Sequence, residues 1–222
     1  MAASSTIYNT DRAFMAKRQN LKCSMRDCFY LRIKLYLPRK HRAGRVLPFQ
    51  NIPGMKPKRI TSTDKSGCSF GMGTYCSEDF PFLLEMYDNF CPKPASQGLP
   101  PEDPEICQSW LKSLLEIGEN YLAWRGENVI GHVSLVPDRQ GESCEFVIFV
   151  DQKQRNLGIG TELTRFALRE SRQLGYDSVW LTVSVSNFIA IKLYKKLGFQ
   201  YFDLDGSERM MRIKLNFLSG SP

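Results

Sequence analysis

One stretch of the chain combines residue types that could hold phosphate. Arg155, Gly158 and Gly160 form an R-x-x-G-x-G turn between a β-branched and aromatic run at 146–150 and an amphipathic stretch. A turn that leads from a strand into a helix presents unpaired amide N–H groups and the positive end of the helix dipole. Glycines leave room for close approach, either by a ligand or by the helix packing on its sheet. The turn therefore predicts a phosphate site, with close packing as the structural alternative.

Two familiar phosphate-binding turns do not match this stretch. A dinucleotide-binding fold needs G-x-G-x-x-G after its first strand, but here the turn comes late and has two glycines. A phosphate loop needs Lys-Ser or Lys-Thr after its last glycine, whereas Gly160 is followed by Thr161 and Glu162. Both ligand classes are therefore disfavoured.

The hydrophobic pattern predicts the elements that must position this turn. Asp103 before Pro104 and Asn187 before Phe188 are typical helix starts, and Gly118, Gly175 and Gly198 are typical stops. The predicted fold class is α/β, with a mixed sheet containing several antiparallel neighbours. Strands are expected at 69–76, 121–124, 129–136, 144–150, 178–185, 199–203 and 209–215, and helices near 78–87, 104–117, 159–174 and 188–197.

Composition favours a cytoplasmic protein without a metal centre. The 222 residues contain no apolar stretch of about 18, the length that a membrane helix needs. Seven cysteines without CxxC pairs and only two histidines lack zinc or haem spacing. We therefore expect reduced thiols, no membrane span and no metal.

The basic charge is concentrated in the N-terminal quarter. Residues 1–54 hold eleven Lys or Arg and two Asp, a charge of +9, so a chain of net charge +7 carries −2 in its remainder. Residues 1–60 therefore read as a basic, flexible extension with one expected strand at 29–37. Alternatives are an arm for nucleic acid or an acidic partner, a targeting segment, or a start codon chosen too far upstream, since Met55 lies just before the compact region.

A second motif makes the first more specific. Val150–Gly160 reads V-x-x-x-x-R-x-x-G-I-G, and Asn187–Phe199 reads N-x-x-A-x-x-L-Y-x-x-L-G-F. In order and spacing the two resemble the GNAT acetyltransferase superfamily, over roughly 67–215. The resemblance implies one domain at 67–218, with splayed central strands and four flanking helices. It also implies direct transfer of an acetyl group from acetyl-CoA to a primary amine on a small molecule, peptide or protein, by a monomer or homodimer.

The resemblance also implies roles for individual residues. The pyrophosphate of coenzyme A would lie on the turn, and the strand before the turn would pair with the pantetheine arm. Asn187 would contact the cofactor, and Tyr194 would lie beside the sulfur and protonate the departing thiolate. The residues implied in cofactor binding are Phe149, Val150, Arg155, Asn156, Leu157, Gly158, Ile159, Gly160, Thr161, Asn187 and Tyr194.

The general base is less well defined than the acid. Glu145 lies on the strand before the turn, but Cys144 occupies the position where some relatives carry an acid. Glu142, a water relay, or an amine that arrives neutral are alternatives, and an acyl-CoA-binding sensor or partner-binding module without turnover is the alternative function. His132 lies within a predicted strand, where histidine is more often structural. We expect acceptor specificity to come from the loop at 88–105, the early helices and the final hairpin.

Overall fold

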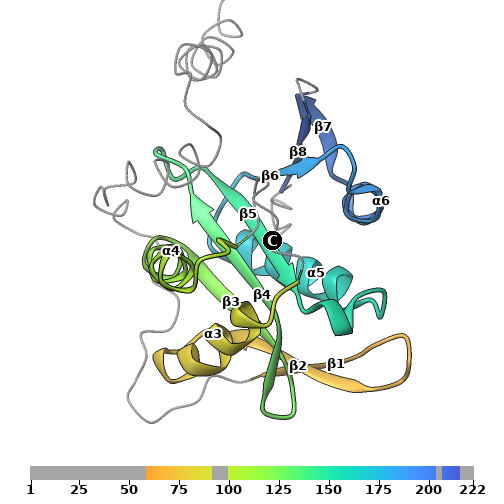
Figure 1. Cartoon of the computed structure of the whole chain (residues 1–222). Helices are drawn as coiled ribbons and strands as arrows, with labels where there is room; N and C mark the ends of the chain where they lie inside the picture. Colours follow the sequence, from red (N-terminus) through yellow and green to blue (C-terminus); the bar gives the residue numbers. More distant parts are fainter. Residues whose placement is uncertain (1–58, 92–99, 204–206, 216–222) are drawn as a thin grey trace, which may run out of the picture.

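The structure, a computed structural model, describes residues 59–91, 100–203 and 207–215. Predictions for residues 1–58, including the strand at 29–37, and for residues 92–99 of the loop at 88–105 lie outside these ranges. The described chain forms one eight-stranded sheet in the order β1-β2-β3-β4-β5-β6-β8-β7, as Figure 1 shows. This arrangement confirms the predicted mixed and mostly antiparallel α/β sheet.

Seven of the eight strands were expected from the sequence, and β1 was not. β1 contains only four residues, ITST, of which three are exposed, so it has no hydrophobic alternation to reveal it. The strands are β1 (Ile60–Thr63), β2 (Ser69–Thr74), β3 (Glu119–Arg125), β4 (Asn128–Pro137), β5 (Ser143–Val150), β6 (Ser178–Ser184), β7 (Gln200–Asp203) and β8 (Glu208–Lys214).

The sheet divides between β5 and β6. These strands form the one parallel pair among the described residues, and it spans only Ser143–Glu145 against Ser178–Trp180. Beyond Glu145, β5 continues to Val150 paired with β4 alone, and β6 continues to Ser184 paired with β8 alone. In Figure 1 the group of β6, β7, β8 and α6 accordingly diverges from the remaining sheet. The splayed central strands implied by the family resemblance are therefore present.

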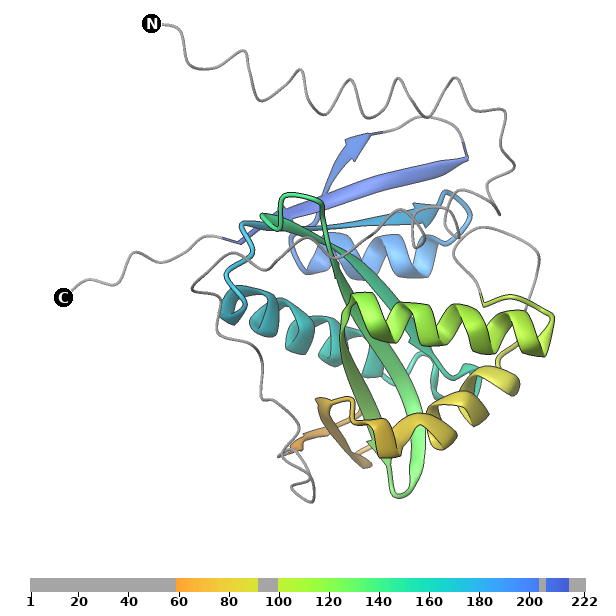
Figure 2. The same cartoon turned by 90° about the vertical axis from the view of Figure 1, so that its left-hand side faces the viewer.

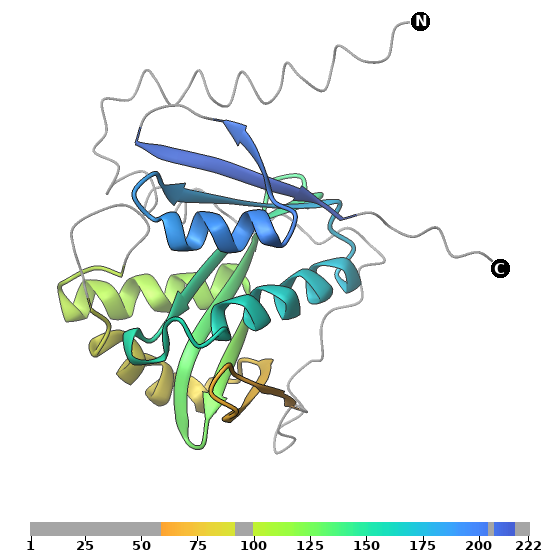
Figure 3. The same cartoon turned by 90° about the vertical axis from the view of Figure 1, so that its right-hand side faces the viewer.

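Two helices cover each face of the sheet. The helices are α3 (Phe80–Asp88), preceded by the 3-10 turn η1 (Ser77–Asp79), then α4 (Pro104–Ile117), α5 (Ile159–Gln173) and α6 (Phe188–Lys196). Figure 2 shows α3 and α4 together on one face, and Figure 3 shows α5 and α6 on the other. Each pair buries its own apolar cluster: Leu83, Tyr87, Trp110 and Leu111 on the first face, and Ile159, Leu163, Phe166 and Tyr194 on the second.

The predicted helix starts are formed as capping chemistry requires. The Asp103 carboxylate accepts the N–H groups of Glu105 and Ile106, and the Asn187 side chain accepts that of Ala190. In α5, Ile159, Leu163, Phe166 and Ala167 recur at helical spacing and are buried against the sheet. This packing fixes the N-terminus of α5 at the end of β5. None of the helices within the described ranges is long and apolar enough to cross a membrane.

Candidate active site

The turn before α5 forms a row of unpaired amides. Asn156 and Gly158 have φ values of +65° and +90°, so both residues adopt the left-handed conformation just before the helix begins. In the first turn of α5, the N–H groups of Thr161 and Glu162 both donate to the Gly158 carbonyl. Within the described residues, the amides of 156–160 have no acceptor. Five unpaired N–H groups at a helix N-terminus fit an anion such as pyrophosphate.

The strand that leads into this turn has an open main-chain edge. Asp138 N–H donates to the Ser143 carbonyl at 2.8 Å, and Asp151 N–H donates to the Ile130 carbonyl at 3.1 Å. Since hydrogen-bonded pairs alternate in an antiparallel ladder, the odd-numbered residues of β5 bond to β4. The main-chain groups of Ile148 and Val150 therefore point toward the side where β6 has separated. An extended amide-containing arm, such as pantetheine, could pair there.

Phe149, which the family resemblance implied as a cofactor contact, lies with its main chain on the other side of β5. It is opposite His132 of β4, and its ring is buried against Tyr87, Phe90 and Trp110. Ile148 is an even-numbered residue like Val150, so its main-chain groups also point away from β4. The sequence did not single out Ile148, because the phase of strand pairing is set by the turns at both ends.

Helix α6 meets the turn and the open strand at one place. A Cβ built on Gly160 would lie 3.6 Å from Cδ1 of Leu193 and 3.7 Å from Cγ2 of Val150. Tyr194, the next residue, packs edge-on against Phe146 of β5 with ring centroids 6.2 Å apart. The anion-binding turn, the open edge of β5 and the tyrosine thus converge although 44 residues separate Val150 from Tyr194.

Tyr194 is suited to hold a proton. Its side chain is buried beside Phe146 and Phe199, and its hydroxyl has no hydrogen-bond partner among the described groups. Burial raises the pKa of the phenol above its ordinary value of 10 because the phenolate would be poorly solvated. The hydroxyl is therefore protonated at neutral pH and available to a group that develops negative charge nearby.

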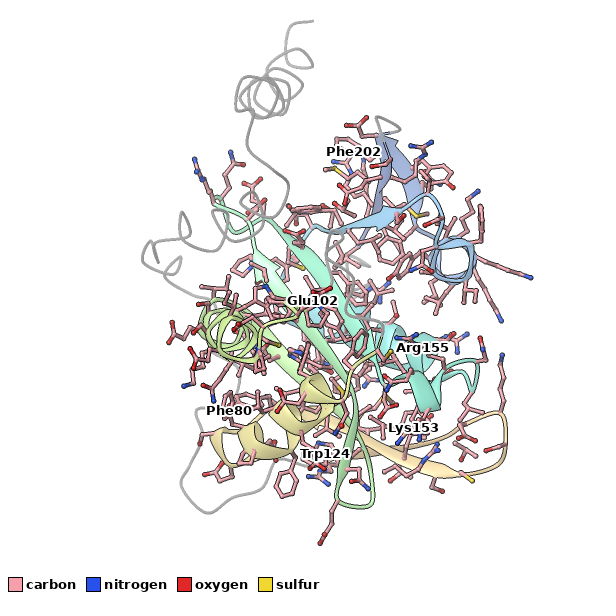
Figure 4. The ribbon with its side chains drawn as sticks, in the orientation of Figure 1. Phe80, Glu102, Trp124, Lys153, Arg155 and Phe202 are labelled. Atoms are coloured by element: carbon pink, nitrogen blue, oxygen red, sulfur yellow. The ribbon has the colours of Figure 1, made fainter. Side chains whose placement is uncertain are left out.

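Arg155 points toward α3 in this structure. Its guanidinium lies 5.2 Å from the Phe90 ring centroid, and Nη2 donates to the Cys91 carbonyl at 3.2 Å. Gln152, in the 3-10 turn η2 (Gln152–Gln154), accepts from the Cys91 N–H and donates to the Asn89 carbonyl. Figure 4 shows Arg155 and Lys153 on this segment, between the end of α3 and α5. The turn is thereby tied to the start of the loop expected to select the acceptor.

Glu145 and Cys144 lie at the point where the sheet divides. Glu145 is half-buried and forms the last parallel pair, with Trp180, on the face covered by α4. Cys144 points to the opposite face, is fully buried, and has Sγ 4.0 Å from the Ser171 hydroxyl. A carboxylate at 145 and a thiol at 144 therefore face different sides of the strand. In the described part of the chain, no three His, Cys, Asp or Glu side chains are grouped to hold a metal ion.

His132 lies in the core in a defined protonation state. Asn120 Nδ2 donates to the carbonyls of Leu115 and Gly118, so its Oδ1 faces Nε2 of His132, 3.0 Å away, and must accept. Nε2 therefore carries the proton, and Nδ1 accepts the Tyr87 hydroxyl at 2.7 Å. Burial lowers the pKa of His132 to about 3. The neutral ring joins α3, β3 and β4, as expected for a structural histidine.

This histidine should make the fold sensitive to mild acid. Its pKa is depressed on folding, so below the ordinary value of about 6.5 the unfolded chain binds a proton that the native chain does not. We expect His132 to remove up to about 1.4 kcal/mol of unfolding free energy per pH unit from pH 6.5 to 5. Urea unfolding at several pH values should show this slope in the wild type and a flatter one in His132→Gln. Equal slopes would show that the native ring is protonated.

Comparison with known proteins agrees with the fold and the motifs. The family described as "Acetyltransferase (GNAT) family" matches residues 81–199, more than half of the chain. Mycothiol acetyltransferase of Geodermatophilus obscurus is 34% identical over 100 residues, which cover 41% of this chain and 32% of that protein. The uncharacterized N-acetyltransferase YvbK of Bacillus subtilis is 32% identical over 92 residues, 41% of this chain and 59% of that protein. Each match therefore spans less than two thirds of the relative's length.

Solved structures share the fold at low sequence identity. The GNAT domain of PAT from S. lividans superposes with a TM-score of 0.61 at 12% identity, covering 71% of this chain and 97% of that domain. YncA of Salmonella typhimurium, a putative acetyltransferase solved with acetyl-CoA, gives 0.55 at 16% identity, covering 68% and 96%. From the match over residues 81–199, the chain belongs to the acetyltransferase (GNAT) family, a family of acyltransferases whose co-substrate is acetyl-CoA.

Proposed function

We propose that the chain transfers an acetyl group from acetyl-CoA to a primary amine by direct transfer. The observation that carries this proposal is the convergence of three features: the unpaired amides of 156–160, the open edge of β5, and Tyr194. Each feature matches one part of coenzyme A or its chemistry, namely pyrophosphate, pantetheine and thioester sulfur.

The proposed binding mode uses main-chain groups for most of the cofactor. The amides of Asn156–Gly160 would hold the pyrophosphate, with Thr161 and Arg155 at the edges of that contact. Val150 and Ile148 would pair with the pantetheine amides in place of the missing β6 partner. Asn187 caps α6 and stays a proposed contact, and Phe149 would support the strand through its buried ring.

Acetyl-CoA supplies the acetyl thioester, and the chain supplies position and proton movement. Tyr194 would donate its proton to the sulfur as the carbon–sulfur bond breaks and the amine nitrogen bonds to the carbonyl carbon. The proton that the amine loses needs an acceptor on the other side of the thioester. Glu145, at the point where β5 and β6 separate, is the carboxylate proposed for this role, directly or through water.

A second function is favoured by the residue at 144. Where some relatives carry an acid, this chain has a buried thiol that faces Ser171. A domain that binds acyl-CoA without turnover, as a sensor or partner-binding module, would need no base. The two functions share the cofactor site and differ only in whether thiol is released.

Calorimetry followed by a thiol-release assay separates these functions. We expect the full chain to bind acetyl-CoA and to release coenzyme A thiol with at least one amine in a panel of polyamines, amino acids and lysine- or N-terminal-amine peptides. The matched control is the same panel with every amine blocked by prior acetylation. Absence of binding would overturn the cofactor site, whereas binding without release from any of the amines would favour the module.

A further inference from the structure

We propose that Lys65, in the turn between β1 and β2, binds a phosphate group of coenzyme A beside the N-terminus of α5. This proposal rests on the proposed function, because it names an additional contact for the same cofactor. Lys65 lies outside the residues matched by the family, so the family motifs do not assign it a role.

The main chain and the side chain of Lys65 both contact the turn before α5, residues 155–161, which we call the cofactor turn. Lys65 N–H donates to the Leu157 carbonyl at 2.9 Å. A Cβ built on Gly158 would lie 3.5, 3.6 and 3.9 Å from Cγ, Cε and Cδ of Lys65. The aliphatic stem therefore lies along the glycine that begins α5, on the turn that carries the unpaired amides.

The turn that carries Lys65 is held in one shape by Asp64. The Asp64 carboxylate accepts the Ser66 hydroxyl at 2.6 Å and the N–H groups of Ser66 and Cys68 at 2.8 and 3.1 Å. Gly67 completes the turn with a φ of +85°. These bonds, the Ser66 hydroxyl foremost, lower the pKa of Asp64 to about 2. The carboxylate therefore stays ionised, and the turn stays closed, across the working pH range.

The same aspartate is linked through Arg125 to the segment that precedes the turn before α5. Arg125, at the end of β3, forms an ion pair with Asp64, and its Nη1 donates to Oε1 of Gln154 at 2.6 Å. Gln154 immediately precedes Arg155. Three segments distant in sequence are thus joined, and the main chain of Lys65 cannot move away from the turn without breaking the Leu157 bond or this bridge.

The positive charge of Lys65 gives a reason to expect a bound anion beside the N-terminus of α5. The Lys65 side chain is exposed and has no carboxylate partner among the described residues, since Asp64 is paired with Arg125. The acid in the first turn of α5, Glu162, is paired with Arg165. A cation beside a helix N-terminus is opposed by the helix dipole, and a phosphate bound between them would reverse that repulsion.

Replacing Lys65 with methionine should weaken cofactor binding without altering chemistry. Methionine retains an apolar stem over Gly158 but removes the charge. We expect the KM for acetyl-CoA to rise about 3- to 10-fold, with kcat at saturation unchanged and the difference shrinking at high salt. Lys65→Arg should restore most of the affinity. Calorimetry with coenzyme A alone gives the same comparison without an acceptor.

Controls separate this contact from general electrostatics and from the proposed function. Lys112→Met removes the same charge from α4, where Lys112 packs near Phe80, and should leave the KM unchanged. A Lys65→Met loss that persists with 3′-dephospho-coenzyme A would support contact with the pyrophosphate, and a loss that disappears would support contact with the 3′-phosphate. Wild-type affinity in Lys65→Met would overturn the proposal, whereas failure of the wild type to bind would overturn the cofactor site instead.

Discussion

Replacing Tyr194 with phenylalanine should lower kcat about 100-fold or more and leave the affinity for acetyl-CoA nearly unchanged. A positioned proton donor typically contributes about 10²–10⁴-fold to the rate. Phenylalanine keeps the ring contacts with Phe146 and Phe199 and removes only the hydroxyl, which bonds to none of the described groups. Steady-state thiol release and calorimetry with coenzyme A measure the two quantities.

The raised pKa of Tyr194 does not weaken it as a donor to this leaving group. In water a phenol of pKa about 10 is a poor acid toward a thiolate of pKa near 8.5. The burial that disfavours the phenolate, however, would disfavour a thiolate released beside it in the same way. The difference between the two pKa values in the site therefore stays close to its value in water, and proton transfer remains feasible as the carbon–sulfur bond breaks.

The matched control for this prediction is Tyr201→Phe. Tyr201 lies on β7, is 40% exposed, and has Lys195 over its ring, so removal of its hydroxyl should leave kcat unchanged. Both variants should unfold close to the wild-type temperature. A kcat in Tyr194→Phe within twofold of wild type would remove the tyrosine from the mechanism and leave protonation of the thiolate to solvent.

Replacing Gly158 with alanine should raise the Kd for coenzyme A about 10-fold. Gly158 has a φ of +90°, which costs an L-residue roughly 1–2 kcal/mol. The new Cβ would meet only the flexible Lys65 stem at ordinary contact distances, so the backbone conformation is the main problem. Relief of that strain would rotate the peptide groups on either side and misalign the amides that hold phosphate. A misalignment worth about 1.4 kcal/mol is a tenfold change in Kd.

Gly175→Ala provides the control because it places the same strain at the other end of the same helix. Gly175 has a φ of +77°, and a Cβ there would meet nothing within 4 Å. Both variants should lose similar unfolding free energy, but only Gly158→Ala should lose affinity in calorimetry. Equal affinities in the two variants would mean that the turn does not hold the cofactor.

Most helices and strands could be predicted from local sequence because their signals are local. Asp103 and Asn187 mark helix starts because their own side chains form the capping bonds. The β-branched run before the turn forms β5 at 143–150. β1 was not predicted because its four residues pair at an edge of the sheet and three of the four side chains are exposed. His132 could be recognised as a strand residue, but its proton position depends on Tyr87 and Asn120, 45 and 12 residues away.

By itself the sequence determined the turn, the helix that follows it and the tyrosine motif, because glycine placement and helical spacing act over a few residues. Only the tertiary structure decided that β6 leaves β5 after Glu145, and that Ile148 rather than Phe149 presents its main chain to the gap. It also placed Lys65 and Arg125 against the turn from positions about 30 to 90 residues upstream. Strand parity and long-range packing are set by pairing partners elsewhere in the chain, so no local pattern encodes them.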